Sequence, residues 1–199
     1  MPSADMAARV AALDWERATT DLDAQGCAVL AGLLSANECE ELAALYDVDE
    51  KFRRRLVMGR HGFGRGEYKY FAYPLPEPIA SLRPALYPPL SRIANRWNEA
   101  MGIAISYPDD HAAFLKRCHA AGQTRPTPLL LRYEAGDYNC LHQDLYGEHV
   151  FPLQVAILLS EPGRDFEGGE FVLTEQRPRM QSRAEVVPLR QGDGVTFAV

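Results

Sequence analysis

Hydrophobic residues recur at helical spacing through the first part of the chain. In residues 84–101 the apolar positions repeat every three or four residues, which is typical of a helix with one buried side. Ser35 and Glu38 form a capping-box pair immediately before another apolar face. The pattern predicts helices over residues 5–22, 35–46, 84–101 and 108–120, with a short strand over 26–33.

From residue 128 onward the pattern changes to short strand-like runs. These runs are separated by clusters of Gly, Pro, Asp and Glu, which favour turns. In residues 151–160, every second residue from Phe151 to Leu159 is apolar, so one face of that strand is expected to be buried. The six runs cover residues 128–135, 139–146, 151–160, 169–174, 184–189 and 194–199. We therefore expect an α+β protein whose second part is a sandwich or small barrel.

The composition is that of a folded globular protein. The 199 residues are 47 % hydrophobic and 24 % charged, as expected for one folded domain over residues 1–199, with a helical part (1–125) and a β part (126–199). No apolar run reaches the ~18 residues of a membrane-spanning helix, and the N-terminus lacks the features of a signal peptide. The four scattered cysteines indicate free thiols, so the expected location is the cytoplasm.

Charge is unevenly spread along the chain. The formal net charge is −6, yet residues 51–69 contain seven basic residues and one acidic residue, so the rest carries about −12. The longer stretch 51–73 also contains aromatic residues, and it has glycines at 62, 64 and 66. This composition predicts a flexible basic–aromatic loop. Cations for phosphates and rings for bases are what a single-stranded nucleic acid needs. A solvated loop whose aromatics pack on the core is the alternative.

His142 and Asp144 are the candidate metal ligands. If residues 139–146 form a strand, these two side chains project from the same face, because strand residues two apart point the same way. An imidazole and a carboxylate can provide two ligands of the facial triad of two histidines and one carboxylate that holds non-haem Fe(II). A His-x-Asp sequence also occurs by chance, so the motif depends on its context.

That context is a resemblance to the Fe(II)/2-oxoglutarate-dependent dioxygenases. Their Tyr-x-x-Gly-x5-His-x-Asp run is matched from Tyr133 to Asp144, and the later Gly-Gly-Glu and Gly-Asp sequences also have counterparts at 168–170 and 192–193. The resemblance implies a double-stranded β-helix (a jelly-roll or cupin-like core) preceded by a helical half. It also implies Fe(II), 2-oxoglutarate and O₂ as cofactor and cosubstrates, and C–H hydroxylation coupled to decarboxylation of the keto acid.

The resemblance also assigns roles to single residues, and one expected residue is missing. Tyr133 and Gln154 are the candidates for contacting 2-oxoglutarate. The family's distal histidine lies on a later strand, so the third ligand is expected beyond residue 199, and His149 is a less favoured substitute. The chain is accordingly expected to lack the last strands of the core. An inactive cupin-like binding fragment is the non-enzymatic alternative.

Two resemblances point to different substrates. The sequence around His142 is similar to AlkB-type enzymes, which oxidatively remove alkyl groups from nucleic-acid bases, although Leu131 replaces their asparagine. The sequence around Glu170 is more similar to prolyl hydroxylases, so a protein or small-molecule hydroxylase is the alternative. The basic–aromatic segment favours damaged or single-stranded nucleic acid. The expected substrate contacts are Arg53, Arg60, Arg65, Tyr68, Lys69, Tyr70 and Tyr146.

Overall fold

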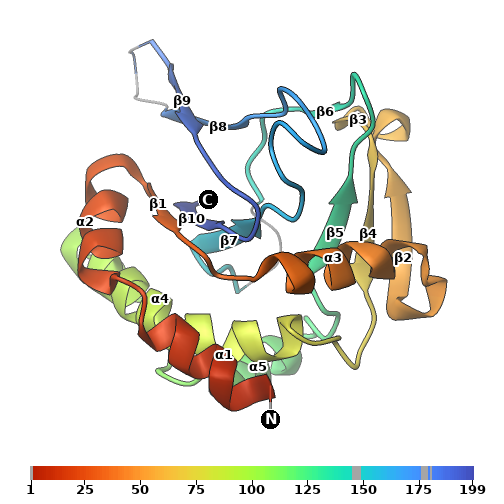
Figure 1. Ribbon diagram of the computed structural model, residues 1–199. Helices are drawn as coiled ribbons and strands as arrows, with labels where there is room; N and C mark the ends of the chain where they lie inside the picture. The colour runs from red at the N-terminus through yellow and green to blue at the C-terminus, as the bar shows by residue number, and fades with distance from the viewer. Residues whose placement is uncertain (1, 145–148, 176–178, 180) are drawn as a thin grey trace.

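Helices form a layer that supports the strands. The computed structural model describes residues 2–144, 149–175, 179 and 181–199. Figure 1 shows helices α1, α4 and α5 below the strands and α2 at the left. The helices are α1 (Pro2–Ala11), α2 (Trp15–Gln25), α3 (Ala36–Ala44), α4 (Ile79–Met101) and α5 (His111–Ala120), with 3₁₀ turns at Leu45–Asp47, Asp49–Lys51 and Met58–Arg60.

Capping explains where several helices begin. Ser35 and Glu38 form the predicted capping box at the start of α3. The single helix predicted over residues 5–22 is wrong in one respect, because the chain divides into α1 and α2. The carboxylate of Asp14 accepts the backbone N–H of Arg17 and so starts a new helix there. The predicted helix over 84–101 is present but starts earlier, at Ile79.

The strands form several antiparallel sheets, so the structure is mixed α/β. One three-stranded sheet has the order β1-β10-β7 and another the order β2-β4-β5, while β3 pairs with β6 and β8 pairs with β9. The strands are β1 (Cys27–Leu30), β2 (Phe52–Val57), β3 (Gly64–Arg65), β4 (Glu67–Phe71), β5 (Leu129–Arg132), β6 (Tyr138–Asn139), β7 (Leu153–Ile157), β8 (Phe171–Glu175), β9 (Arg183–Val187) and β10 (Gly194–Ala198).

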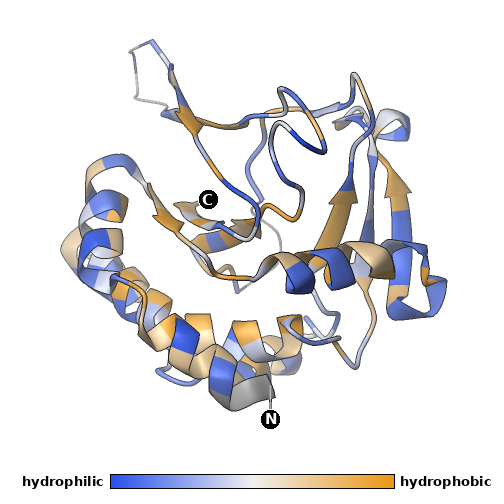
Figure 2. Ribbon diagram, viewed as in Figure 1, coloured by the Kyte–Doolittle hydropathy of each residue, from blue (hydrophilic) through white to orange (hydrophobic). Residues whose placement is uncertain are grey.

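Strand β7 separates two hydrophobic cores. Leu153 is buried and Val155 and Ile157 pack with it against the helical layer, which confirms the predicted apolar face of this strand. Ala156 points the other way, into a second core in which the Phe171 ring of β8 contacts β10. Figure 2 shows hydrophobic residues along the strands of both three-stranded sheets. The residue between Leu153 and Val155, Gln154, therefore lies on the side of β7 away from the helices.

The cysteines are separate from one another, as their scattered positions in the sequence predict. All four are free thiols; Cys140 is exposed and the other three are buried. The helices of the described part of the chain are each too short or too polar to cross a bilayer.

Candidate functional site

His142 and Asp144 converge, but a strand does not bring them together. Nε2 of His142 lies 3.3 Å from Oδ1 of Asp144, and both side chains are partly exposed. Strand β6 ends at Asn139, so the strand predicted over 139–146 is wrong for residues 140–144. The segment is instead irregular, and Nδ1 of His142 lies 2.8 Å from the backbone oxygen of Cys140. The predicted pairing of the two side chains is confirmed, whereas its predicted cause is not.

The contact with Cys140 determines how the imidazole is oriented. A carbonyl oxygen can only accept a hydrogen bond, so Nδ1 carries a proton and donates it. In the neutral ring Nε2 then holds a free lone pair, and this lone pair faces the carboxylate of Asp144. A carbonyl that fixes the tautomer in this way is usual for histidines that bind metals through the other nitrogen. The donor atoms therefore fit two ligands of a divalent metal.

Gln154 holds the carboxylate from the opposite side. Its side-chain Nε2 donates a 3.0 Å hydrogen bond to Oδ2 of Asp144 from the side of β7 that faces away from the helices. This contact leaves Oδ1 directed at His142. Gln154 was expected to bind the cosubstrate, which stays a prediction, and the structure brings its amide to the candidate metal ligand. The sequence carried no signal for this contact, because it joins residues on different segments.

The described residues supply no third ligand. Among them, no group of three His, Cys, Asp or Glu side chains is arranged to hold a metal ion. The backbone of His149 is tied elsewhere, since its N–H and its carbonyl both bond to the side chain of Gln123. Tyr146, a predicted substrate contact, lies outside the described residues.

Tyr133 lies between the candidate metal motif and the basic segment. The residue is 42 % exposed and its ring lies against the backbone of Gly66, where an added Cβ would come within 2.8 Å of it. Burial raises the pKa of the Tyr133 hydroxyl, and a hydrogen bond with Asn139 lowers it. The effect of burial is larger, so the pKa lies above its usual value. The hydroxyl therefore stays protonated at neutral pH and can donate a hydrogen bond.

The basic segment is a sheet and not a loop, so the prediction of a flexible loop over 51–73 is wrong. Residues 52–57 and 67–71 form β2 and β4, which pair with each other, and β4 also pairs with β5. Aromatic and β-branched residues within these runs, such as Phe52, Val57, Tyr68 and Phe71, favour strands, and the arginine run obscured this signal. The glycines at 62, 64 and 66 serve the short connection between these strands, which is the part that contacts β6.

This connection is attached directly to the His142 segment. Strand β3 pairs with β6, and the backbone N–H of Cys140 donates to the carbonyl of Phe63 at 2.8 Å. Gly64 has a φ of +123° and sits so close to Tyr138 that an added Cβ would lie 2.2 Å from its carbonyl oxygen. Cys140 therefore links the basic segment to the candidate metal ligand through its two backbone groups.

Lys69 does not serve as the predicted phosphate contact. It is 7 % exposed, and its ammonium group donates to Oδ1 of Asp49 and to the backbone oxygen of Tyr46, both at 2.7 Å. A long cationic side chain that is buried with its charge paired cannot also reach a phosphate. The structure favours a structural role for Lys69, because Tyr46 and Asp49 in the 3₁₀ turns after α3 cover this face of β4.

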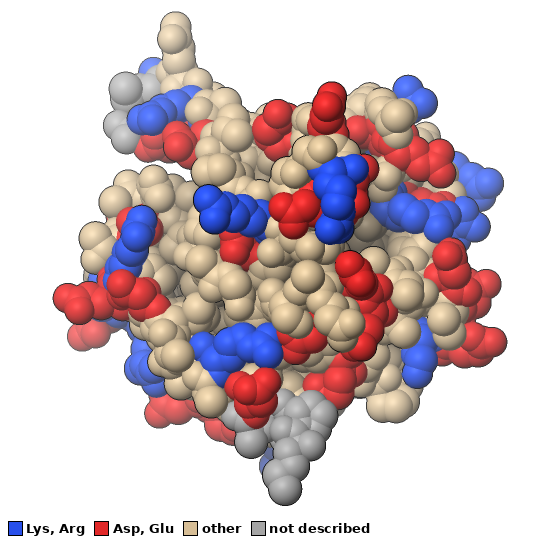
Figure 3. All heavy atoms as spheres, viewed as in Figure 1, with Lys and Arg blue, Asp and Glu red and all other residues tan. Residues whose placement is uncertain are grey.

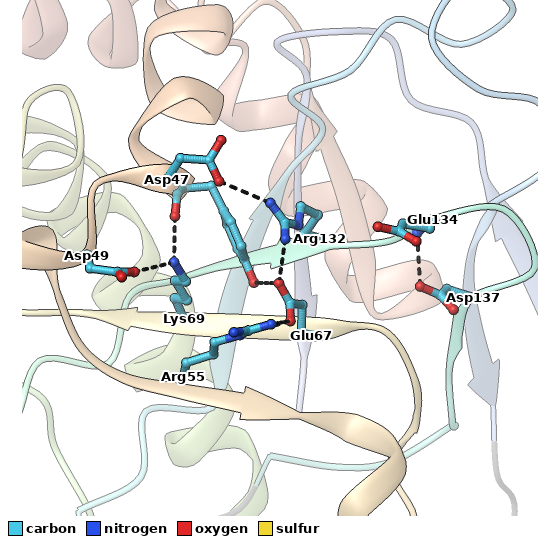
Figure 4. A network of polar contacts seen from close by, with 9 residues as sticks. Asp47, Asp49, Arg55, Glu67, Lys69, Arg132, Glu134 and Asp137 are labelled. Carbon is cyan, nitrogen blue, oxygen red and sulfur yellow. Dashed lines mark hydrogen bonds and ion pairs between the residues drawn. The ribbon is translucent and has the colours of Figure 1, made fainter.

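Lys69 belongs to a network of charged groups on that face (Figure 4). Glu67 accepts hydrogen bonds from Arg55, from Arg132 and from the hydroxyl of Tyr46. Burial alone raises the pKa of Glu67, but the bonds from Arg55 and Tyr46 outweigh it, so the pKa lies below its usual value. Burial and the neighbouring Glu67 raise the pKa of the Tyr46 hydroxyl. The network stabilises the sheet as an ionised cluster.

The other predicted substrate residues occupy three places. Arg53 and Tyr70 lie together, with the guanidinium 4.4 Å from the ring centroid, and the Tyr68 ring meets that of Tyr70 edge-on. Arg60 is exposed in the 3₁₀ turn after β2. Arg65 is exposed and lies 3.7 Å from Asp137. The structure thus brings Arg53, Tyr68 and Tyr70 together and separates them from Lys69.

Comparison with known proteins identifies the family. A family model described as "Oxygenase, catalysing oxidative methylation of damaged DNA" matches residues 66–199. The chain belongs to this family, Oxygenase-NA. The match to Oxygenase-NA includes His142, Asp144 and Gln154, whereas Arg53 and Arg60 precede it.

Curated relatives extend this comparison. The chain is 51 % identical over 150 residues to the proteins named "Uncharacterized protein MT2286" and "Uncharacterized protein Rv2227", from the CDC 1551 / Oshkosh and H37Rv strains of Mycobacterium tuberculosis. The match covers 73 % of this chain and 64 % of each relative, so the chain spans less than two thirds of their length. No solved structure matches the chain significantly.

Proposed function

We propose that this member of Oxygenase-NA is an Fe(II)/2-oxoglutarate-dependent dioxygenase that removes alkyl groups from damaged nucleic-acid bases. One observation carries the proposal. Nε2 of His142 and a carboxylate oxygen of Asp144 lie 3.3 Å apart, within the segment that matches an oxygenase family. That donor pair is the part of a non-haem iron site that a His-x-Asp motif supplies.

The residues of the site take separate roles in this proposal. His142 and Asp144 would hold Fe(II), together with a third ligand that the described residues do not supply. Gln154 positions the carboxylate of Asp144, as the carbonyl of Cys140 positions the ring of His142. Tyr133 donates its hydroxyl to the carboxylate of 2-oxoglutarate. The bound metal and keto acid supply the oxidation of a C–H bond.

The proposed reaction balances as a demethylation. An N-methyl group, O₂ and 2-oxoglutarate give an N-hydroxymethyl group, succinate and CO₂. One oxygen atom of O₂ enters the hydroxymethyl group and the other enters succinate. The hydroxymethyl group then leaves as formaldehyde, and the base nitrogen recovers its hydrogen. Oxidation of a methyl carbon on a base therefore ends in its removal, which fits a family described as acting on damaged DNA.

The order of the strands supports a jelly-roll core. Strands β7 and β10 pair with each other, and the hairpin β8–β9 between them in sequence forms a different sheet. The two sheets meet through a shared core that includes Phe171 and Phe197. A long hairpin folded across two facing sheets is how a jelly roll winds. We therefore propose that residues 1–199 belong to one oxygenase domain with a double-stranded β-helix core.

Turnover with defined substrates tests the proposal. The natural polypeptide, including any residues that follow Val199, is incubated with Fe(II), 2-oxoglutarate and a single-stranded oligonucleotide carrying one N-methylated base. We expect succinate and formaldehyde in equal amounts, and little of either with the unmethylated oligonucleotide. Stimulation by proline-containing peptides alone would overturn the nucleic-acid substrate in favour of protein hydroxylation. No turnover and no iron binding would overturn the enzyme in favour of a binding protein.

A further inference from the structure

The sheet β2-β4-β5 sorts the basic residues of its strands onto two faces. In antiparallel strands, directly paired residues point to the same side. Arg55 pairs with Lys69, and Arg132 pairs with Glu67, so these four side chains share one face. Figure 4 shows that the cations of this face are bound to carboxylates. Their charges are already neutralised within the protein.

The opposite face carries a different set of side chains. Arg54 pairs with Tyr70, and Tyr68 pairs with Leu131, which is 47 % exposed. A bulge between Phe52 and Arg54 places Arg53 on this side as well, with its guanidinium over the Tyr70 ring. We call this surface the outer face of the sheet. It combines cations, aromatic rings and an exposed aliphatic side chain.

The cations of the outer face are not neutralised by carboxylates. Arg53 donates two hydrogen bonds to the backbone oxygen of Pro126, which brings it beside Arg125. Burial lowers the pKa of Arg53, and the nearby charges of Arg125 and Arg54 lower it further. Within the described ranges, no ion pair joins Arg53, Arg54 or Arg125 to an acidic side chain.

This grouping contrasts with the rest of the molecule. The whole chain carries a formal charge of −6, and basic and acidic side chains are intermixed on the face shown in Figure 3. Three guanidinium groups that repel one another raise the free energy of the unbound protein, and a polyanion that binds them lowers it. The grouping therefore favours a ligand with a series of negative charges.

The outer face is continuous with the candidate metal site. Strand β5 begins at Leu129, which pairs with Tyr70, and the chain continues from it to Tyr133. At the usual rise per strand residue, Leu129 and Tyr133 are about 13 Å apart. The Tyr133 hydroxyl is hydrogen-bonded to Asn139, and the next residue is the one whose carbonyl orients His142. A ligand lying along β5 thus passes from the arginine group to the metal motif.

We propose that the outer face binds the single strand of a nucleic acid beside the base to be oxidised, with Arg53, Arg54 and Arg125 at its phosphates and Tyr68 and Tyr70 against its bases. This inference rests on the proposed nucleic-acid substrate. A single strand is the occupant because unpaired bases can pack on aromatic rings, whereas a duplex keeps its base faces stacked inside.

Binding is tested apart from catalysis. The natural polypeptide, free of iron and 2-oxoglutarate, is titrated with a fluorescent oligothymidylate 15-mer at several salt concentrations, and anisotropy gives the Kd. For Arg54→Ala and Arg125→Ala we expect a three- to tenfold weaker Kd, and a salt slope reduced by about 0.7 for each phosphate that is no longer neutralised. Arg92→Ala, an exposed arginine on α4, is the charge-matched control and leaves both values unchanged.

A second pair of measurements separates the role of the aromatic rings from that of the arginines. Tyr70→Leu should weaken binding several-fold with the salt slope unchanged, because it removes an aromatic surface and no charge. A duplex of the same length should bind more weakly than the single strand. Equal Kd values and slopes in wild type, Arg54→Ala and Arg125→Ala would overturn the location, and tighter duplex binding would overturn the single-strand assignment. Neither result alters the proposed oxidation chemistry, which is measured separately by succinate release.

Discussion

The side-chain amide of Gln154 donates a hydrogen bond to Oδ2 of Asp144 and leaves Oδ1 facing Nε2 of His142. The amide comes from β7, a strand anchored in the helix-facing core by Leu153. The carboxylate is therefore oriented by a rigid part of the fold, although it lies on an irregular segment itself. This relationship predicts that the metal affinity depends on a residue that does not touch the metal.

Gln154→Leu tests that dependence. Loss of the amide leaves the carboxylate free to rotate, and removal of a residue that orients a metal ligand typically weakens metal binding ten- to 100-fold. We expect a fall in Fe(II) affinity in that range, measured by anaerobic calorimetry. Gln25→Leu, which removes a glutamine amide bonded to the backbone of Cys27, is the control. An unchanged affinity in Gln154→Leu would show that the amide does not position the ligand.

The close approach of Gly64 to Tyr138 predicts a steric effect on the same site. In Gly64→Ala the new methyl group meets the carbonyl oxygen of Tyr138, so β3 and β6 must separate. Gly62→Ala also places a side chain at positive φ, at +71°, but meets no atom within 4 Å. Both variants carry backbone strain, and only the first carries the clash.

Hydrogen exchange distinguishes these two glycine variants. We expect the amide of Cys140, which bonds to the carbonyl of Phe63, to exchange at least about tenfold faster in Gly64→Ala than in Gly62→Ala. Fe(II) affinity should fall in the first variant, since Cys140 also orients His142. Equal protection of Cys140 in both variants would contradict the link between the two segments.

Lys69 is predicted to matter for stability and not for nucleic-acid binding. Lys69→Met keeps the aliphatic stem but leaves the backbone oxygen of Tyr46 without its donor, at a cost of roughly 1–3 kcal/mol in the free energy of unfolding. Urea unfolding should show this loss, while the Kd for oligothymidylate stays at the wild-type value. Weakened binding without a loss of stability would return Lys69 to the set of residues that bind phosphate.

His111 predicts a pH dependence of stability. Burial, the largest cause, and the nearby Arg83 together lower its pKa to about 4, against the opposing effect of Asp110. Between that value and ~6.5, the unfolded chain binds more protons than the folded one. The contribution to stability is therefore present above pH ~6.5 and is lost as the pH falls toward 4.

Two histidine variants on α5 check this window. Between pH 6.5 and 4, the free energy of unfolding should fall less in His111→Gln than in wild type. The expected difference is roughly 1 kcal/mol, because the ring is partly exposed to solvent. His119→Gln, an exposed position on the same helix, should follow the wild-type curve. Parallel curves for wild type and His111→Gln, measured by thermal melts, would contradict a neutral buried imidazole.

Local signals in the sequence predicted much of the fold. The Ser35–Glu38 capping box and the alternation around Leu153 both depend on residues close in sequence, and both predictions are confirmed. The arginine run in 51–69 led to the wrong prediction of a loop, because arginines on both faces of β2 hide the short apolar ends of this strand at Phe52 and at Leu56–Val57.

The arrangement of the site could be predicted only in part. Convergence of His142 and Asp144 was expected from their spacing, although an irregular segment and not a strand brings them together. The partners that decide the other roles come from distant segments: Arg132 reaches Glu67, and Lys69 reaches Asp49. Strand register determines which arginines are neutralised, and the bulge between Phe52 and Arg54 shifts this register in a way that the sequence did not indicate.

The most direct test of the account is an anaerobic titration of the natural polypeptide with Fe(II) and 2-oxoglutarate, followed by the visible charge-transfer band of the chelated keto acid. We predict a saturable band in wild type and in the exposed control Asp109→Ala, and its loss in Asp144→Ala. No band in wild type, or a band of equal strength in Asp144→Ala, would contradict the assignment of His142 and Asp144 as iron ligands.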